Sequence, residues 1–142
     1  MDDTELLRYS RQIMLPELDI AGQQRLANAA VLIVGLGGLG SPLALYLASS
    51  GVGELVLVDD DHVDESNLQR QIVHTEASIG ANKAESAAAR INALNKSTKL
   101  TSITHRLERK EFADLLETVQ LVFDATDNLA SRHFLNEMCW RK

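Results

Sequence analysis

The sequence predicts an α/β fold built on a doubly wound, mostly parallel β-sheet. Two observations support this prediction. Residues 30–34 and 54–58 are short apolar runs of the kind that form buried parallel strands, and the segment between them has helical spacing. Helix and strand signals then continue to alternate to the end of the chain. Such alternation is typical of a parallel sheet with right-handed helical crossovers.

A local signal predicts each remaining element. Two helices are expected before the first strand, at 4–15, where Pro16 ends the helix, and at 22–28. After the second strand, spacing and apolar runs predict helices at 82–94, 111–117 and 129–140, and strands at 100–104 and 121–123. The chain ends directly after a helix that should lead into another strand. We therefore expect a single domain that is the N-terminal part of a longer protein.

Three glycines follow the first strand with the spacing G-x-G-x-x-G, at Gly35, Gly37 and Gly40. The first permits a tight turn, the second lets a phosphate approach the backbone, and the third lets helix 39–50 pack close to the strand. The first turn of that helix offers unpaired N–H groups to an anion. Asp59 ends the second strand about 20 residues further on, where an acidic residue binds a ribose hydroxyl. The pattern predicts a Rossmann-like nucleotide site.

Composition limits the class of protein. With 142 residues the chain is long enough for one domain, and its net charge of −6 argues against a broad basic surface for nucleic acid. There is one cysteine, no apolar run of membrane-spanning length, and an acidic start unlike a signal peptide. We expect a cytoplasmic protein that does not bind a membrane.

The segment 59–71 is polar and long for a connection, which often indicates function. Arg70 lies in this segment and Lys83 begins the next helix, so both should lie near the carboxyl ends of the strands, where ligands bind in such sheets. Together they favour a triphosphate. Arg11 in the first helix is a third candidate cation. The alternative is that all three are ordinary solvated charges.

Asp124 and Asp127 follow the last strand. We expect Asp127 to hold Mg²⁺, because this ion binds through one or two carboxylates together with substrate phosphates. For Asp124 we expect a structural role in an Asx turn. Capping of the last helix by Asp127 or Asn128 is the alternative.

Several motifs together resemble the ThiF/MoeB/HesA family, the ubiquitin-activating-enzyme-like adenylyltransferases. They are Arg8-Tyr9-Ser10-Arg11-Gln12, Gly35-Leu36-Gly37-Gly38-Leu39-Gly40, Asp59-Asp60-Asp61, Ser66-Asn67-Leu68-Gln69-Arg70-Gln71, Lys83 and Asp124-Ala125-Thr126-Asp127-Asn128. The resemblance spans essentially the whole chain and is greatest to the molybdopterin-synthase adenylyltransferase branch.

The resemblance implies an activity and a set of site residues. The C-terminal Gly-Gly carboxylate of a ubiquitin-like sulfur-carrier protein would be adenylated by Mg·ATP, with release of pyrophosphate. Catalytic roles are implied for Arg70, Lys83, Asp127 and Arg11, the last acting in the partner subunit's site of a homodimer joined by a helical arm at 1–29. Nucleotide contacts are implied for Gly35, Gly37, Gly38, Asp59, Asp61, Ser66, Asn67, Leu68, Gln69, Arg70, Lys83, Asp127 and Asn128. Family members also bind zinc through two Cys-x-x-Cys pairs, which this chain lacks.

Three other interpretations remain open. An enzyme of the related tRNA threonylcarbamoyladenosine dehydratase type adenylates a carbonyl oxygen on a tRNA base. A nicotinamide dehydrogenase uses the same glycine turn and Asp59, but leaves Arg70 and Lys83 without a role. The chain could also be an inactive nucleotide-binding fragment.

Overall fold

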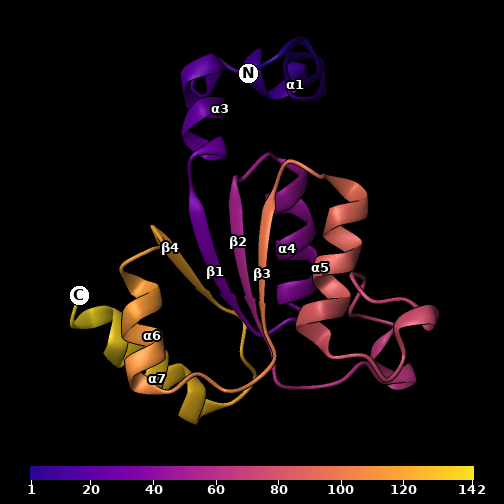
Figure 1. Ribbon diagram of the computed structural model, residues 1–142, viewed down its shortest axis with the longest axis vertical. Helices are drawn as coiled ribbons and strands as arrows, with labels where there is room; N and C mark the ends of the chain where they lie inside the picture. The colour runs from indigo at the N-terminus through magenta and orange to yellow at the C-terminus, as the bar shows by residue number, and fades with distance from the viewer.

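The computed structural model describes residues 1–142 and shows one parallel sheet between two layers of helices (Figure 1). The strands lie in the order β3-β2-β1-β4. Their bounds are β1 (Ala30–Val34), β2 (Glu54–Val58), β3 (Lys99–Ile103) and β4 (Leu121–Asp124). The last residue of β1 is in register with the last residues of β2 and β4, and the same holds between β2 and β3. All four carboxyl ends therefore lie at one edge.

Alternate residues of each strand face opposite layers, as the pleat requires. Val31 and Ile33 of β1 pack with α4 (Gly40–Ser49) and α5 (Lys83–Leu94). Leu32, between them, packs on the other face with α6 (Arg109–Leu116) and α7 (Leu129–Trp140). Figure 1 shows these two helix pairs on opposite sides of the sheet. The doubly wound α/β prediction is confirmed.

The N-terminal prediction is partly wrong. One helix at 4–15 was expected, but the structure has α1 (Asp3–Arg8) and α2 (Ser10–Ile13), interrupted at Tyr9. α3 (Asp19–Ala27) also begins earlier than residue 22, because the Asp19 carboxylate accepts the N–H groups of Ala21 and Gly22. None of the helices is both long and apolar enough to span a bilayer.

Tyr9 interrupts the first helix because its side chain is fixed in the core. The ring is buried, and its hydroxyl accepts a hydrogen bond from Asn95 Nδ2 at 2.9 Å. Asn95 Nδ2 also donates to Ala48 O at 2.8 Å, at the end of α4. The N-terminal helices are thereby held where the strands begin, at the end of the sheet opposite the glycine turn (Figure 1).

The segment between β2 and α5 contains two short 3-10 turns, η1 (Glu65–Asn67) and η2 (Glu76–Ser78). The Asp64 carboxylate caps η1 by accepting from Ser66 N at 2.9 Å. The Asn82 side chain caps α5 by accepting from Ala84 N at 2.8 Å. These caps fix the course of a segment that lacks apolar periodicity.

Replacing Tyr9 by phenylalanine should destabilise the fold by about 1 kcal/mol, because Asn95 loses one buried hydrogen-bond partner. Tyr46→Phe is the matched control, since the Tyr46 side chain is largely exposed. The measurement is the free energy of unfolding in urea. Equal values for the two variants would contradict this account of how the N-terminal helices are held.

Candidate nucleotide-binding site

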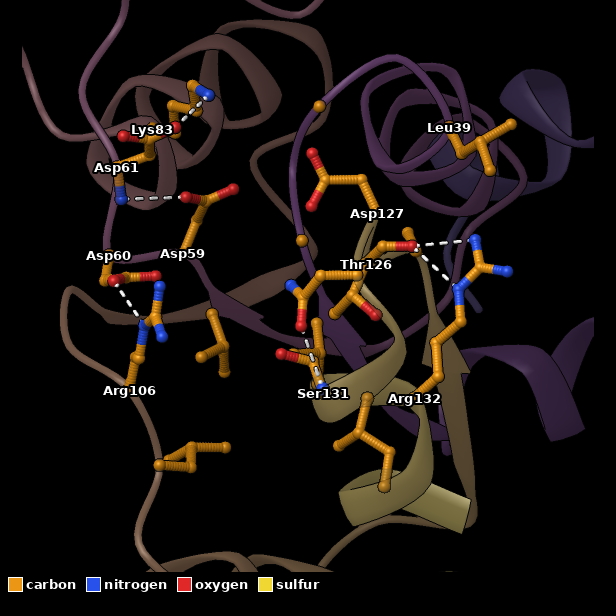
Figure 2. A pocket seen from close by; sticks show the side chains of 18 of the residues that line it. Leu39, Asp59, Asp60, Asp61, Lys83, Arg106, Thr126, Asp127, Ser131 and Arg132 are labelled. Atoms are coloured by element: carbon orange, nitrogen blue, oxygen red, sulfur yellow. Dashed lines mark hydrogen bonds and ion pairs between the residues drawn. The ribbon is translucent and has the colours of Figure 1, made fainter.

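A cavity of about 860 Å³ lies at the edge where the strands end. Each strand contributes the residues that follow it, and the first turns of α5 and α7 complete the walls (Figure 2). The lining includes Gly35, Gly37, Gly38 and Leu39 after β1; Asp59, Asp60 and Asp61 after β2; His105, Arg106 and Leu107 after β3; and Ala125, Thr126, Asp127 and Asn128 after β4. A cleft of this size is large enough for a nucleotide.

The first and third glycines of the motif are required by contacts. Gly35 has a φ of +93°, and a Cβ there would lie 2.7 Å from Ala125 O, so the turns after β1 and β4 touch. A Cβ on Gly40 would lie 1.9 Å from Gly35 O. Only glycine lets the first turn of α4 close this tightly on the strand end, which is the close packing the sequence predicted.

The middle of the glycine turn presents free backbone donors. α4 has no side-chain cap, and the N–H groups of Gly37, Gly38 and Leu39 make no hydrogen bond within the protein. All three residues line the cavity. Unpaired N–H groups at the positive end of a helix dipole bind anions. This part of the cavity is suited to a phosphate.

Asp59 joins the glycine turn to the end of β2. Its Oδ2 accepts from Leu36 N at 2.7 Å, and its Oδ1 accepts from Asp61 N at 2.9 Å. Each carboxylate oxygen can accept a second hydrogen bond. Asp59 can therefore shape the turn and still accept from a ligand hydroxyl, as a ribose-binding residue must.

Lys83 is buried and lines the cavity. Its Nζ lies 2.8 Å from Asp61 Oδ2, and only 7% of its side chain is exposed. The Lys83 ammonium beside Asp61 holds the pKa of that carboxyl below its usual value of 3.8. The pair fixes a positive charge in the cavity wall, and an ammonium has two further protons to donate to a ligand.

Arg70 and Gln71 enter the cavity from the segment after η1. The Arg70 stem passes 3.8 Å from the position of a Cβ on Gly38, and its Nη1 donates to Ser66 O at 3.1 Å. Gln71 is buried, lines the cavity beside Gly37, and leaves its Oε1 without a hydrogen-bond partner. Arg70 makes no ion pair in the protein, so its charge is available to an anion.

Three polar residues at the end of β4 or after it have different roles: Asp124, Asp127 and Asn128. Asp124 Oδ1 accepts from Thr126 N at 3.0 Å, an Asx turn that confirms the structural role expected for Asp124. Asn128 caps α7 by accepting from Ser131 N at 2.9 Å. The Asp127 carboxylate makes no hydrogen bond or ion pair in the protein and lines the cavity, as Figure 2 shows. It is the free acidic group of the site.

Sequence reasoning missed two walls of the cavity. The turn after β3 brings in His105, Arg106 and Leu107, and Arg106 Nε lies 2.8 Å from Asp60 Oδ2. The first turns of α7 bring in Arg132, whose Nη2 donates to Thr126 O at 2.9 Å. The rule that ligands bind where parallel strands end could have identified the turn after β3. No sequence signal marked Arg132.

Five residues predicted for the site lie outside the cavity wall. Four of them belong to or follow η1: Ser66, Asn67, Leu68 and Gln69. The carbonyls of Ser66 and Asn67 accept hydrogen bonds from Arg70 Nη1 and Arg70 N, both at 3.1 Å. Arg11 is exposed in α2, and its neighbour Gln12 donates to Ser50 O, at the end of α4 opposite the glycine turn. Within one chain, the structure brings together Arg70, Lys83, Asp127 and the glycine turn, but not Arg11.

Several known proteins resemble this chain in sequence. The adenylyltransferase and sulfurtransferase MOCS3 of Mus musculus is 50% identical over 135 residues, which are 95% of this chain and 29% of the relative. The sulfur carrier protein ThiS adenylyltransferase of Escherichia coli K12 is 47% identical over 139 residues, which are 98% of this chain and 55% of the relative. The chain thus spans about half or less of these relatives.

Solved structures share the fold. The E. coli tRNA N6-threonylcarbamoyladenosine dehydratase TcdA, in complex with ATP, superposes with a TM-score of 0.82 at 30% identity, covering 90% of this chain and 52% of that one. The sequence model of the ThiF family matches residues 9–142. The chain therefore belongs to the ThiF family.

Proposed function

We propose that this chain forms the ATP-binding part of an adenylyltransferase that activates a ubiquitin-like sulfur-carrier protein. The substrate group is the carrier's C-terminal Gly-Gly carboxylate, and the products are an acyl-adenylate and pyrophosphate. The observation that supports this most is the shared cavity of Arg70, Lys83, Asp127 and the glycine turn. Relatives of 47–50% identity that are adenylyltransferases support the same reaction.

The chemistry suits the residues of the cavity. A carboxylate oxygen forms a bond to the α-phosphorus of ATP, and the bond from that phosphorus to the bridging oxygen of the β-phosphate breaks. The nucleophile is already deprotonated, so no general base is needed. Catalysis then consists of positioning and of stabilising negative charge at phosphorus. Backbone N–H groups and two cations perform these tasks without a nucleophilic side chain.

Lys83 and Arg70 have different roles in this proposal. Lys83 is fixed by Asp61 in the wall and would donate to an oxygen of the α-phosphate. Arg70 is held only by a carbonyl and can follow the phosphates that leave. Gly37 and Gly38 would donate their N–H groups to the phosphate chain, and Asp59 would accept from the ribose.

Mg²⁺ fits the free carboxylate of the site. This ion needs only one or two protein carboxylates when phosphate oxygens and water supply its other ligands. Asp127 is unpaired in the cavity and offers that ligand. When bound, Mg²⁺ neutralises phosphate charge. We therefore propose Asp127 as its protein ligand.

We further propose a homodimer in which the arm at 1–29 contacts the second copy. Arg11 is too far from the cavity of its own chain to contribute there, so a second copy would have to supply it. The arm also carries exposed apolar side chains: Leu7, Met14 and Leu15 are 78%, 73% and 55% exposed. Apolar side chains gathered in one segment favour an interface.

A tRNA substrate is the second candidate function, because TcdA shares the fold at 30% identity. The higher identity to the ThiS adenylyltransferase favours a protein carrier. The two functions differ in what the reaction requires. Adenylation that depends on tRNA rather than on a Gly-Gly carrier would establish the second.

ATP–pyrophosphate exchange tests the proposed function. Exchange should occur only in the presence of a carrier that ends in Gly-Gly. Lys83→Met should lower the rate at least about 100-fold, because it removes a donor aimed at the phosphate undergoing reaction. Lys99→Met is the matched control, since Lys99 pairs with Glu54 where those strands begin, far from the cavity.

The control variant should retain the rate of the wild-type chain. Equal rates for Lys83→Met and the wild-type chain, with melting temperatures that agree, would rule out the role of Lys83. Exchange that is as fast without a Gly-Gly carrier as with one would contradict the proposed substrate.

Two glycine variants distinguish the contribution of the turn to stability from its contribution to ATP binding. Gly38→Ala should keep the melting temperature near that of the wild-type chain, because a Cβ there meets nothing closer than 3.8 Å, yet it should weaken ATP binding by crowding the phosphate. Gly40→Ala should destabilise the fold by more than about 2 kcal/mol, because its Cβ would overlap Gly35 O. Thermal melting and calorimetric titration with ATP measure both effects. Unimpaired ATP binding by Gly38→Ala would contradict the placement of the phosphate.

A further inference from the structure

A buried histidine, His74, forms a hydrogen bond to the backbone of the glycine turn. His74 Nε2 lies 3.0 Å from Leu36 O, the carbonyl that precedes Gly37. Ser41 Oγ donates to the same oxygen at 3.1 Å, and Leu36 N donates to Asp59 Oδ2 at 2.7 Å. Both peptide groups of Leu36 are therefore fixed by side chains from three other parts of the chain.

This anchoring sets the direction of a phosphate donor. In a trans peptide the carbonyl and the following N–H point in opposite directions. The Leu36 carbonyl points to the buried side chains of His74 and Ser41, so the N–H of Gly37, a residue that lines the cavity, points away from them. That N–H has no acceptor in the protein. Its orientation depends on what holds Leu36 O.

The hydrogen bonds of His74 also define its form. A carbonyl oxygen can only accept, so Nε2 carries the proton, and Nδ1 accepts from the hydroxyl of Ser86 at 2.9 Å. Burial lowers the pKa of His74 below its usual value of 6.5, which favours this neutral form. Both ring nitrogens are occupied, so His74 is not available as an acid or base for a substrate.

We propose that His74 is a positioning residue for phosphate binding: it orients the Leu36–Gly37 peptide so that the Gly37 N–H faces the nucleotide. The inference rests on the proposed function, because it assigns His74 a task in binding ATP. Preorganised donors bind phosphate without the cost of ordering the turn at that moment. Without His74, only Ser41 holds the carbonyl.

The test compares variants that keep or remove the donor at Nε2. In His74→Leu the donor is absent, and the dissociation constant for ATP should rise about fivefold to tenfold, as expected for the loss of one buried hydrogen bond. In His74→Gln the side-chain amide places a donor near the position of Nε2, and ATP affinity should stay within about twofold of the wild-type value. Exposed His133, changed to leucine, is the matched control.

The affinity for adenosine distinguishes a positioning role of His74 from a merely structural one. Adenosine lacks phosphates, so its affinity should be the same in the wild-type chain and in all three variants. If His74→Leu does not fold, His74→Asn replaces it, since its shorter amide can pair with Ser86 but does not reach Leu36. That variant should show the same loss of ATP affinity.

Each outcome decides the proposal. Equal ATP affinity in His74→Leu and the wild-type chain would overturn it, and so would an equal loss of ATP and adenosine affinity. In these cases the wild-type chain still binds ATP, and the proposed function stands. A wild-type chain that binds no ATP would overturn the proposed function and this inference with it.

Discussion

The four parallel strands end in register with one another, and this is the constraint on which the site depends. Because β1 ends in register with β2 and β4, the segments that follow them leave the sheet side by side. Two backbone hydrogen bonds continue the sheet into these turns, from Gly35 N to Val58 O at 2.8 Å and from Ala125 N to Val34 O at 2.9 Å. A shift of register would separate the glycine turn from Asp59 and from Asp127. The fold therefore builds the cavity before any ligand is bound.

The charges of the cavity are largely balanced within the protein. Lys83 pairs with Asp61, and Arg106 pairs with Asp60. These pairs hold two cations in fixed places, while they reduce the net attraction of the site for a polyanion. Arg70 and the N–H groups of the glycine turn have no such partner and are free to bind phosphate, whereas the unpaired Asp127 carboxylate is free to bind a cation. Lys83 belongs to both groups, because its ammonium is held by Asp61 and still has protons to donate to a ligand.

Much of the fold could be predicted because local signals were strong. The apolar runs of β1 and β2 and the glycine spacing fixed the first strand–helix–strand unit, which the structure confirms at its predicted bounds for both strands. The break at Tyr9 could not be predicted, because it results from a contact with Asn95, far away in the sequence. Periodicity within 4–15 carries no information about that partner.

The site, like the fold, could be predicted where a local motif marked it and not where it depends on long-range packing. Residues within recognisable motifs, such as Lys83 and Asp127, were placed correctly at the cavity, although their roles stay predictions. Arg106 and Arg132 lie on elements without a motif and reach the cavity only through the packing of β3 and α7. Arg11 lies at the opposite end of the sheet from the cavity of its own chain, and its role in the partner subunit's site stays a prediction.

The central claim is that one cavity at the carboxyl edge of the sheet binds the phosphates of ATP. A crystal structure of the chain with a non-hydrolysable ATP analogue tests it most directly. The account predicts phosphate oxygens within hydrogen-bond distance of the N–H groups of Gly37 and Gly38 and of Lys83 Nζ, with the ribose at Asp59. An analogue bound elsewhere, or bound here with its phosphates directed away from the glycine turn, would contradict it.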